Sequence, residues 1–224
     1  MSERPNPLSS ESQSVSHEAE DDVLVEWVKI VGVSIVLAFG IRYFIAEARY
    51  IPTESMLPTL QVNDRLIIEK VSYRFRPPLR GEIIVFSPPE GLQRQQPDFH
   101  DALIKRVVGL PGDNVTITNG RVYVNDLPIA EQYIAEAPNY EWGPVTIPEE
   151  SYFVLGDNRN RSNDSHFWGY VHEDDIIGRA VVRFWPLKRI GGINPVPLYP
   201  DQSYGSDRPW VAALPLGQGF HLSL

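Results

Sequence analysis

An apolar segment at residues 23–48, VLVEWVKIVGVSIVLAFGIRYFIAEA, constrains the fold of this chain more than any other feature. Its uncharged part, Ile30 to Ile41, is 12 residues long, whereas a membrane-spanning helix needs about 20 predominantly apolar residues. Lys29 and Arg42 lie near the two ends of this part, where long side chains can extend to the membrane surface, and aromatic residues flank them. With these flanks, the segment is long enough to be a transmembrane anchor.

A cleaved secretory signal is the alternative, because Ala46-Glu47-Ala48 imitates an A-x-A cleavage site directly after the apolar run. A cleaved signal begins with a short basic region, whereas residues 1–22 contain six acidic residues and one arginine. The flanks therefore favour an uncleaved anchor, preceded by a disordered acidic tail over residues 1–22 that has too few apolar side chains to fold. Basic residues on both sides of the span leave its orientation open.

Charge and composition exclude several classes of function. The tail accounts for −5 of the net charge of −9, and no compact basic run interleaved with aromatic residues suggests a nucleic-acid partner. The chain has no cysteine, which excludes thiol catalysis and disulfides, and its five histidines form no ligand pair of the H-x-x-x-H kind. We expect no metal site, no cofactor and no nucleic-acid partner.

From residue 66 onward the sequence is typical of β structure. Short β-branched or aromatic runs alternate with Gly, Pro and Asx residues, and in VTIT-NG-RVYV Asn119-Gly120 predicts a type I′ hairpin. No helix-length amphipathic pattern recurs, which disfavours a parallel sheet with crossover helices. We predict a mainly β chain: one N-terminal transmembrane helix, an antiparallel coiled-sheet or barrel-like domain at residues 49–186, and a Pro/Gly-rich extension at 187–224.

Ser55 lies between Pro52 and Pro58, in YIPTESMLPTL directly after the anchor. The two prolines keep this segment out of a regular helix interior and stiffen it. A stiff loop suits a nucleophile, although a serine in a Pro-bounded turn is more often a cap or a solvated hydroxyl. Ser55 is therefore a candidate nucleophile that needs a base.

Two residues are candidates for that base. His100 lies in the polar stretch GLQRQQPDFHD, with only Asp98 or Asp101 to orient it in a Ser-His-Asp arrangement. Lys105 lies in ALIKRVVGL, where a strand would place it on an apolar face and burial would lower its pKa toward neutrality. The structural alternative is that Lys105 extends into solvent from a strand edge.

A polar loop, GDNRNRSNDSHFWG at residues 156–169, holds the remaining candidates. Its side chains are typical of a turn-rich loop that bonds its own backbone. In a functional role, Ser162 could hydrogen-bond a buried lysine. Asp164 could pair with a cation such as Arg106 or Arg159.

Four ordered motifs resemble those of the type I signal peptidases, membrane-anchored Ser-Lys endopeptidases: residues 50–60, RGEIIVF at 80–86, KRVVGLPGD at 105–113, and the polar loop at 156–169. The resemblance covers about residues 23–186. It implies that Ser55 is the nucleophile and Lys105 the general base. It also implies oxyanion donors at the Ser55 N–H and the Thr53 hydroxyl, a lysine-orienting role for Ser162 and a structural role for Asp164.

This chain departs from the usual pattern at two positions. Thr53 stands where many relatives have serine, which keeps the hydroxyl but restricts its rotation. His166 stands where an arginine is usual, which predicts that an ion pair at this position is weaker or depends on pH. Neither departure removes the nucleophile or the base.

The resemblance further implies the partners and the location. The partners are the signal peptides of exported preproteins, cut after a small-x-small pattern, and a lipid bilayer. The N-terminal tail is expected in the cytosol and the catalytic domain outside the cell membrane, or across a thylakoid or other internal membrane. Two alternatives remain: a membrane-tethered β binding module with a degenerate site, and a Ser-Lys protease acting on itself, for which a cut after Ala48 is the candidate.

Overall fold

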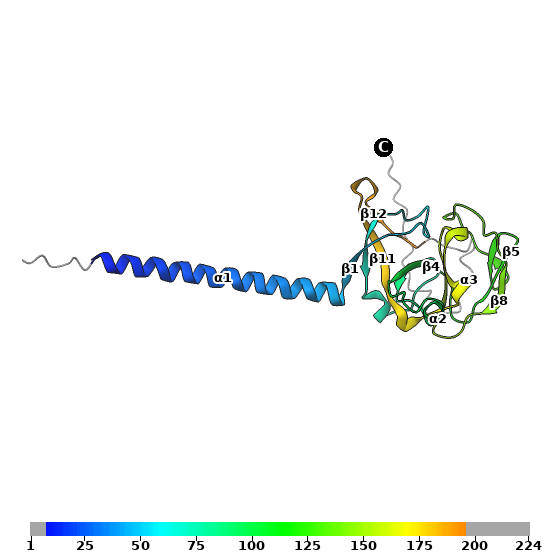
Figure 1. Cartoon of the computed structure of the whole chain (residues 1–224), viewed down its shortest axis with the longest axis horizontal. Coiled ribbons are helices and arrows are strands. Elements are labelled where there is room, and N and C mark those ends of the chain that lie inside the picture. The colour runs from blue at the N-terminus through cyan, green and yellow to red at the C-terminus, as the bar shows by residue number, and fades with distance from the viewer. Residues whose placement is uncertain (1–7, 196–224) are drawn as a thin grey trace, which may run out of the picture.

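A computed structural model describes residues 8–195, with side chains from residue 26 onward, and shows one long helix leading into a β domain (Figure 1). The helix is α1 (Leu8–Phe44), and two short helices, α2 (Glu90–Gln95) and α3 (Ser165–Trp168), lie in the domain. Single 3-10 turns occur at η1 (Ser72–Arg74), η2 (Arg159–Arg161), η3 (Glu173–Asp175) and η4 (Leu187–Arg189). The strands are β1 (Ala46–Tyr50), β2 (Arg65–Glu69), β3 (Ile83–Phe86), β4 (Leu103–Gly109), β5 (Asn114–Thr118), β6 (Arg121–Val124), β7 (Leu127–Pro128), β8 (Trp142–Thr146), β9 (Ser151–Leu155), β10 (Val171–His172), β11 (Ile176–Trp185) and β12 (Gly191–Gly192).

The apolar part of α1 projects away from the domain as a candidate membrane span. Glu26–Phe44, 19 residues with a mean hydropathy of 1.6, is not covered by any other part of the structure. The helix begins at Leu8, inside the segment for which the sequence predicted disorder, because no Gly or Pro interrupts residues 8–31. Extending an existing helix is much easier than nucleating one. Residues 1–7 of the predicted tail lie outside the described part of the chain.

The helix expected to form the anchor ends earlier than the sequence predicted. Helix α1 stops at Phe44, and Ala46–Ala48, expected as the end of the anchor, lies in β1. All five residues of β1 pair with β2, so the strand satisfies backbone groups that a longer helix would have bonded internally. The helix therefore passes into the sheet with only Ile45 between them.

The larger sheet carries the candidate site. Its strands follow the order β1-β2-β11-β3-β4-β9-β10, with β12 paired to β11, and every pair is antiparallel. Register shifts interrupt the pairing of β11 with β2 and β3 and that of β4 with β9, and such bulges bend and twist strands. The predicted mainly β, antiparallel and curled architecture is confirmed.

The smaller sheet follows the order β7-β6-β5-β8 and lies at the end of the domain away from α1 (Figure 1). Strands β5 and β6 form the predicted hairpin, with φ of 50° at Asn119 and 73° at Gly120. These positive φ values match a type I′ turn, whose twist suits the flanking strands. Of the predicted C-terminal extension, only η4, β12 and the residues up to 195 are described.

Three clusters of buried side chains form the core. One joins the smaller sheet to β9, one lies under β2, β3, β11 and the serine segment, and one lies under β3, β4 and β9. The second cluster contains Ile51, Met56 and Leu60, all almost completely buried. The segment around Ser55 is therefore held by its own apolar side chains.

Candidate active site

Ser55 occupies a series of tight turns, as expected for a Pro-bounded loop. The Ile51 N–H donates to the Asp64 carbonyl (2.8 Å), and the Leu60 N–H donates to the Met56 carbonyl (2.9 Å). The Ser55 carbonyl accepts from the backbone N–H of Asn158 (3.0 Å), which joins the turns to the polar loop. Ser55 is only 7% exposed, so its hydroxyl is positioned rather than freely solvated.

Lys105 reaches Ser55 from strand β4, where it pairs with Ile84 of β3. Its Nζ lies 3.0 Å from Ser55 Oγ and donates to the Ile104 carbonyl at 2.9 Å. Lys105 is 3% exposed, and this burial lowers its pKa from 10.5 to about 8, although the charges of Asp164 and Asp157 oppose the change. A buried amine with this pKa can become the neutral base that a serine requires at near-neutral pH.

Thr53 supplies a second hydroxyl beside the first. Its Oγ1 lies 3.3 Å from Ser55 Oγ, while Thr53 as a whole is exposed. The backbone N–H of Ser55 donates to no acceptor within residues 8–195. One side-chain O–H and one backbone N–H are thus available where an oxyanion would form.

Ser162 is buried close to the serine segment, but the hydrogen bond to Lys105 that the sequence suggested is not formed. Its hydroxyl has no hydrogen-bond partner among the residues described. It packs on Gly156, where an added Cβ would lie 2.2 Å from Ser162 Oγ and 2.5 Å from the Ser55 carbonyl oxygen. Ser162 and the Ser55 carbonyl therefore both lie close to Gly156, and the missing side chain at residue 156 makes this close approach possible.

Asp164 pairs with a different residue from those the sequence suggested. One carboxylate oxygen accepts from the Gly156 N–H (2.8 Å), and the other lies 2.6 Å from His166 Nδ1. The predicted partners, Arg106 and Arg159, pair instead with Asp157 and Glu131. Asp164 caps α3, so its carboxylate faces the backbone and side chain two residues ahead.

His166, which the family resemblance puts at a position where arginine is usual, contacts two other aromatic rings. Its ring stacks on Tyr140, with 4.0 Å between centroids and a 10° angle between planes, and also contacts Phe167. A histidine carries charge only when protonated. The expectation that an ion pair at this position is weaker or depends on pH stays a prediction.

An ion pair that the sequence analysis missed ties the polar loop to β4. Arg106 donates from Nε and a terminal nitrogen to the two oxygens of Asp157 (2.8 and 2.7 Å), and both residues are at most 1% exposed. The hydroxyl of Thr59 donates to the same carboxylate (2.5 Å), and the Arg106 guanidinium lies 4.2 Å from the centre of the Tyr133 ring. This pair joins the strand of Lys105, the polar loop and the serine segment.

The sequence contains only a weak indication that Arg106 and Asp157 form an ion pair. Arg106 directly follows the candidate base, and Asp157 lies at the start of the fourth motif. Their contact depends on the register of β4 and β9, in which Arg106 pairs with Leu155 and Asp157 follows two residues later. Sequence spacing alone does not specify that register.

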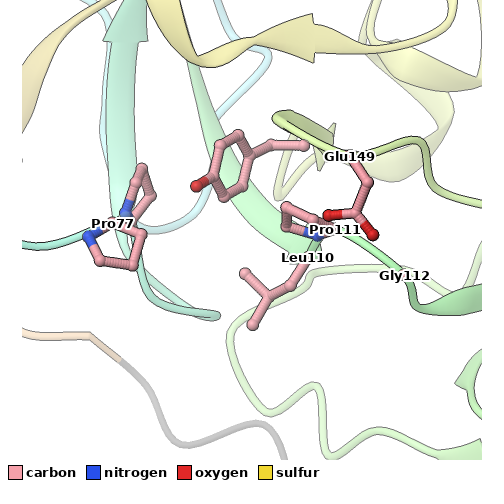
Figure 2. A pocket seen from close by; sticks show the side chains of 7 residues that line it. Pro77, Leu110, Pro111, Gly112 and Glu149 are labelled. Carbon is pink, nitrogen blue, oxygen red and sulfur yellow. The ribbon is translucent and has the colours of Figure 1, made fainter. Parts of the chain in front are cut away.

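Other candidates lie apart from these groups. His100 is exposed, and within the described residues no hydrogen bond joins it to Ser55, so the Ser-His-Asp arrangement is not formed. No group of three or more His, Asp or Glu side chains in that part of the chain could hold a metal ion. The pocket in Figure 2, about 350 Å³, contains none of the candidate reactive residues; it is lined by Pro77, Pro78, Leu110, Pro111, Gly112, Glu149 and Tyr152.

Comparison with known proteins finds similarity to signal peptidases and to a thylakoidal processing peptidase. Residues 24–185 match the family described as signal peptidase, peptidase S26. A signal peptidase I from Leptolyngbya laminosa is 57% identical over 88% of this chain and 98% of its own. A probable signal peptidase I-2 from Synechocystis is 54% identical over 81% of this chain and 82% of its own. A probable thylakoidal processing peptidase 2 from Arabidopsis thaliana is 42% identical over 77% of this chain and 47% of its own.

Proposed function

The chain belongs to the peptidase S26 family of signal peptidases, and from that premise we propose how Ser55 and Lys105 carry out its reaction. It is a serine peptidase that removes signal peptides, and its N-terminal apolar helix is a candidate membrane anchor. The observation that carries the assignment of the two residues is the 3.0 Å distance from Lys105 Nζ to Ser55 Oγ, in a position almost closed to water.

In the acylation step, neutral Lys105 takes the proton of Ser55 as Oγ attacks the scissile carbonyl carbon. The neutral form is accessible because burial lowers the pKa of this lysine to about 8. The new C–O bond gives a tetrahedral intermediate, and the C–N bond then breaks as the lysine ammonium returns its proton to the leaving amine. This step releases the mature protein and leaves the signal peptide as an ester on Ser55.

The negative oxygen of the intermediate is placed between the Ser55 N–H and the Thr53 hydroxyl. The Thr53 hydroxyl lies 3.3 Å from Ser55 Oγ, and the N–H has no competing acceptor among residues 8–195. Donors fixed before the reaction stabilise developing charge without reorganising. In the second half of the reaction, Lys105 removes a proton from water as the water oxygen attacks the ester carbon. The bond from this carbon to Ser55 Oγ then breaks, the signal peptide leaves with a new C-terminal carboxyl group, and the lysine ammonium returns a proton to Oγ.

The substrate is an extended segment of an exported preprotein, cut after a small-x-small pattern. An extended peptide can add to the sheet through backbone hydrogen bonds, with small side chains where the space is limited. The proposed orientation places the N-terminus in the cytosol and the β domain across the membrane. Ser55, only 11 residues beyond the end of α1, then meets the substrate near the bilayer surface.

Cleavage of a purified preprotein with an A-x-A site tests the assignment. We expect the full chain in detergent to cut it at a rate that rises with pH through about 8, as Lys105 loses its proton. Ser55→Ala and Lys105→Met should each abolish cleavage. Ser151→Ala is the matched control, because Ser151 is also buried but starts β9 and is outside the proposed machinery.

The same series distinguishes the alternatives. Activity that survives in Lys105→Met but is lost in His100→Ala would refute the dyad and restore a histidine base. A folded wild-type chain that binds the preprotein without cutting it would instead support the degenerate binding module.

A further inference from the structure

The connection between β2 and β3 begins beside the end of α1. We call its first part, Lys70–Pro77, the foot; it contains the 3-10 turn η1. The foot takes no part in the chemistry proposed above. Its contacts and exposed side chains nevertheless indicate a second role.

The foot bonds the carbonyl groups that the helix leaves open at its end. The Lys70 N–H donates to the Ile45 carbonyl (2.9 Å), and the Lys70 ammonium donates to the Arg42 carbonyl (3.4 Å). The Arg74 guanidinium donates to the Phe44 carbonyl (3.2 Å) and lies 5.9 Å from the centre of its ring. Cations at a helix C-terminus also complement the helix dipole. These contacts fix the foot to the anchor.

Two acidic side chains, Glu69 and Glu82, fix the foot to the larger sheet. Glu69 accepts from the backbone N–H of Ser72 (2.6 Å), and the Ser72 and neighbouring N–H groups hold the pKa of Glu69 below its ordinary value despite its partial burial. Glu82, almost completely buried, accepts from the Tyr73 hydroxyl (3.1 Å) and pairs with Arg76 (2.5 Å). The foot is therefore a firm connection between helix and sheet.

The outer side of the foot carries an aromatic ring and cations. Phe75 is 83% exposed, and Tyr43 and Phe44 at the end of the helix are exposed as well. The side chains of Arg42 and Arg74 form no ion pair with any residue from 26 to 195. Exposed aromatic side chains beside arginines that form no ion pair are typical of segments that lie in the headgroup region of a bilayer, where Phe can insert among the lipids and anionic lipids attract the cations.

We propose that the foot rests in the anionic headgroup layer, with Phe75 inserted among the lipids and Arg42 and Arg74 against their negative groups. The foot then fixes the height of the catalytic sheet above the membrane. This inference rests on the proposed insertion of α1 but not on the Ser-Lys chemistry.

Site-directed labelling tests the proposal, because the chain has no cysteine of its own. Single cysteines at Phe75, Ile35 or Leu127 would carry a fluorophore in the Ser55→Ala full chain, which removes any effect of catalysis. Leu127 is also exposed but lies in the smaller sheet, away from the helix (Figure 1). The chains would be placed in nanodiscs that contain nitroxides at shallow or deep positions of the lipid chains.

We expect deep nitroxides to quench the label at Ile35, shallow nitroxides to quench the label at Phe75, and neither to quench the label at Leu127. Quenching at Phe75 no greater than at Leu127, with Ile35 quenched, would overturn the foot alone. An unquenched label at Ile35 would refute the anchor and the foot together.

Comparing nanodiscs of two lipid compositions tests whether the foot prefers anionic lipid. Phosphatidylglycerol in the nanodisc should increase quenching at Phe75 relative to phosphatidylcholine alone, and Arg42→Gln/Arg74→Gln should remove that increase. Equal quenching in both lipids before the arginines are changed would refute the preference for anionic lipid.

Discussion

Replacing Lys105 with methionine should stabilise the folded protein while it abolishes cleavage. Methionine keeps an unbranched apolar side chain in the buried site but removes the amine. Burial lowers the pKa of Lys105 from 10.5 to about 8, so folding disfavours the ammonium form. Each pKa unit corresponds to about 1.4 kcal/mol, so the charged lysine costs roughly 3 kcal/mol of folding free energy.

The net gain in the variant is smaller because contacts are lost as well. Lys105 Nζ bonds Ser55 Oγ and the Ile104 carbonyl, and a typical hydrogen bond contributes about 1 kcal/mol net. Subtracting these two bonds from the cost of the buried charge, we expect Lys105→Met to raise the free energy of unfolding by about 1 kcal/mol at pH 7.

The stability gained by Lys105→Met should become smaller as the pH rises. Below about pH 8 Lys105 is protonated in both the folded and the unfolded wild-type chain, so the buried ammonium destabilises the folded state by its full amount. Between about 8 and 10.5 the unfolded chain holds more of the proton than the folded chain, so wild-type stability rises with pH and the advantage of the variant shrinks.

Guanidinium unfolding of both chains in detergent, followed by tryptophan fluorescence at pH 7 and pH 10.5, measures this difference. Lys188→Met, at an exposed lysine, is the control and should show neither effect. A Lys105→Met chain no more stable than wild type at pH 7 would contradict the proposed cost of burial. So would an advantage that stays constant up to pH 10.5.

Three further substitutions test other parts of the site. Gly156→Ala should greatly reduce cleavage, since the added Cβ would overlap Ser162 Oγ; initial rates of preprotein cleavage, with circular dichroism to check folding, measure it. Thr53→Val should lower kcat by about 10²–10³ with little change in KM, and Thr53→Ser should not; steady-state kinetics would exclude oxyanion donation if Val and Ser variants were equally active. Asp157→Asn should destabilise the fold by about 3–5 kcal/mol, because Arg106 would remain buried without its counter-charge; denaturant unfolding close to wild type would disprove that estimate.

The features that depend on local pattern were predictable from the sequence. Asn119-Gly120 fixes a hairpin through its own backbone preference, and the prolines around Ser55 stiffen its turn without help from distant residues. The proximity of Ser55 and Lys105 was inferred from family resemblance, since 50 residues separate them in the chain.

The features that depend on pairing between distant segments were not predictable. Helix α1 ends at Phe44 because β2 offers a partner to residues 46–50, which no local pattern reveals. Asp164 could be assigned a cation by composition only, and the capping geometry of α3 gives it His166 instead. The missed contact of Arg106 with Asp157 has the same origin, in the register of two strands.

The direct passage from helix to strand has a consequence for the lifetime of the protein. Ala46-Glu47-Ala48 resembles a cleavage site, yet each of its residues is paired with β2, and Glu47 forms ion pairs with Lys70 and Arg49. A protease must hold its substrate by free backbone groups, so the junction becomes a substrate only after β1 has separated from the sheet. Intact copies are thereby shielded from one another in a crowded membrane, and any cut after Ala48 would mark a molecule that had already begun to unfold.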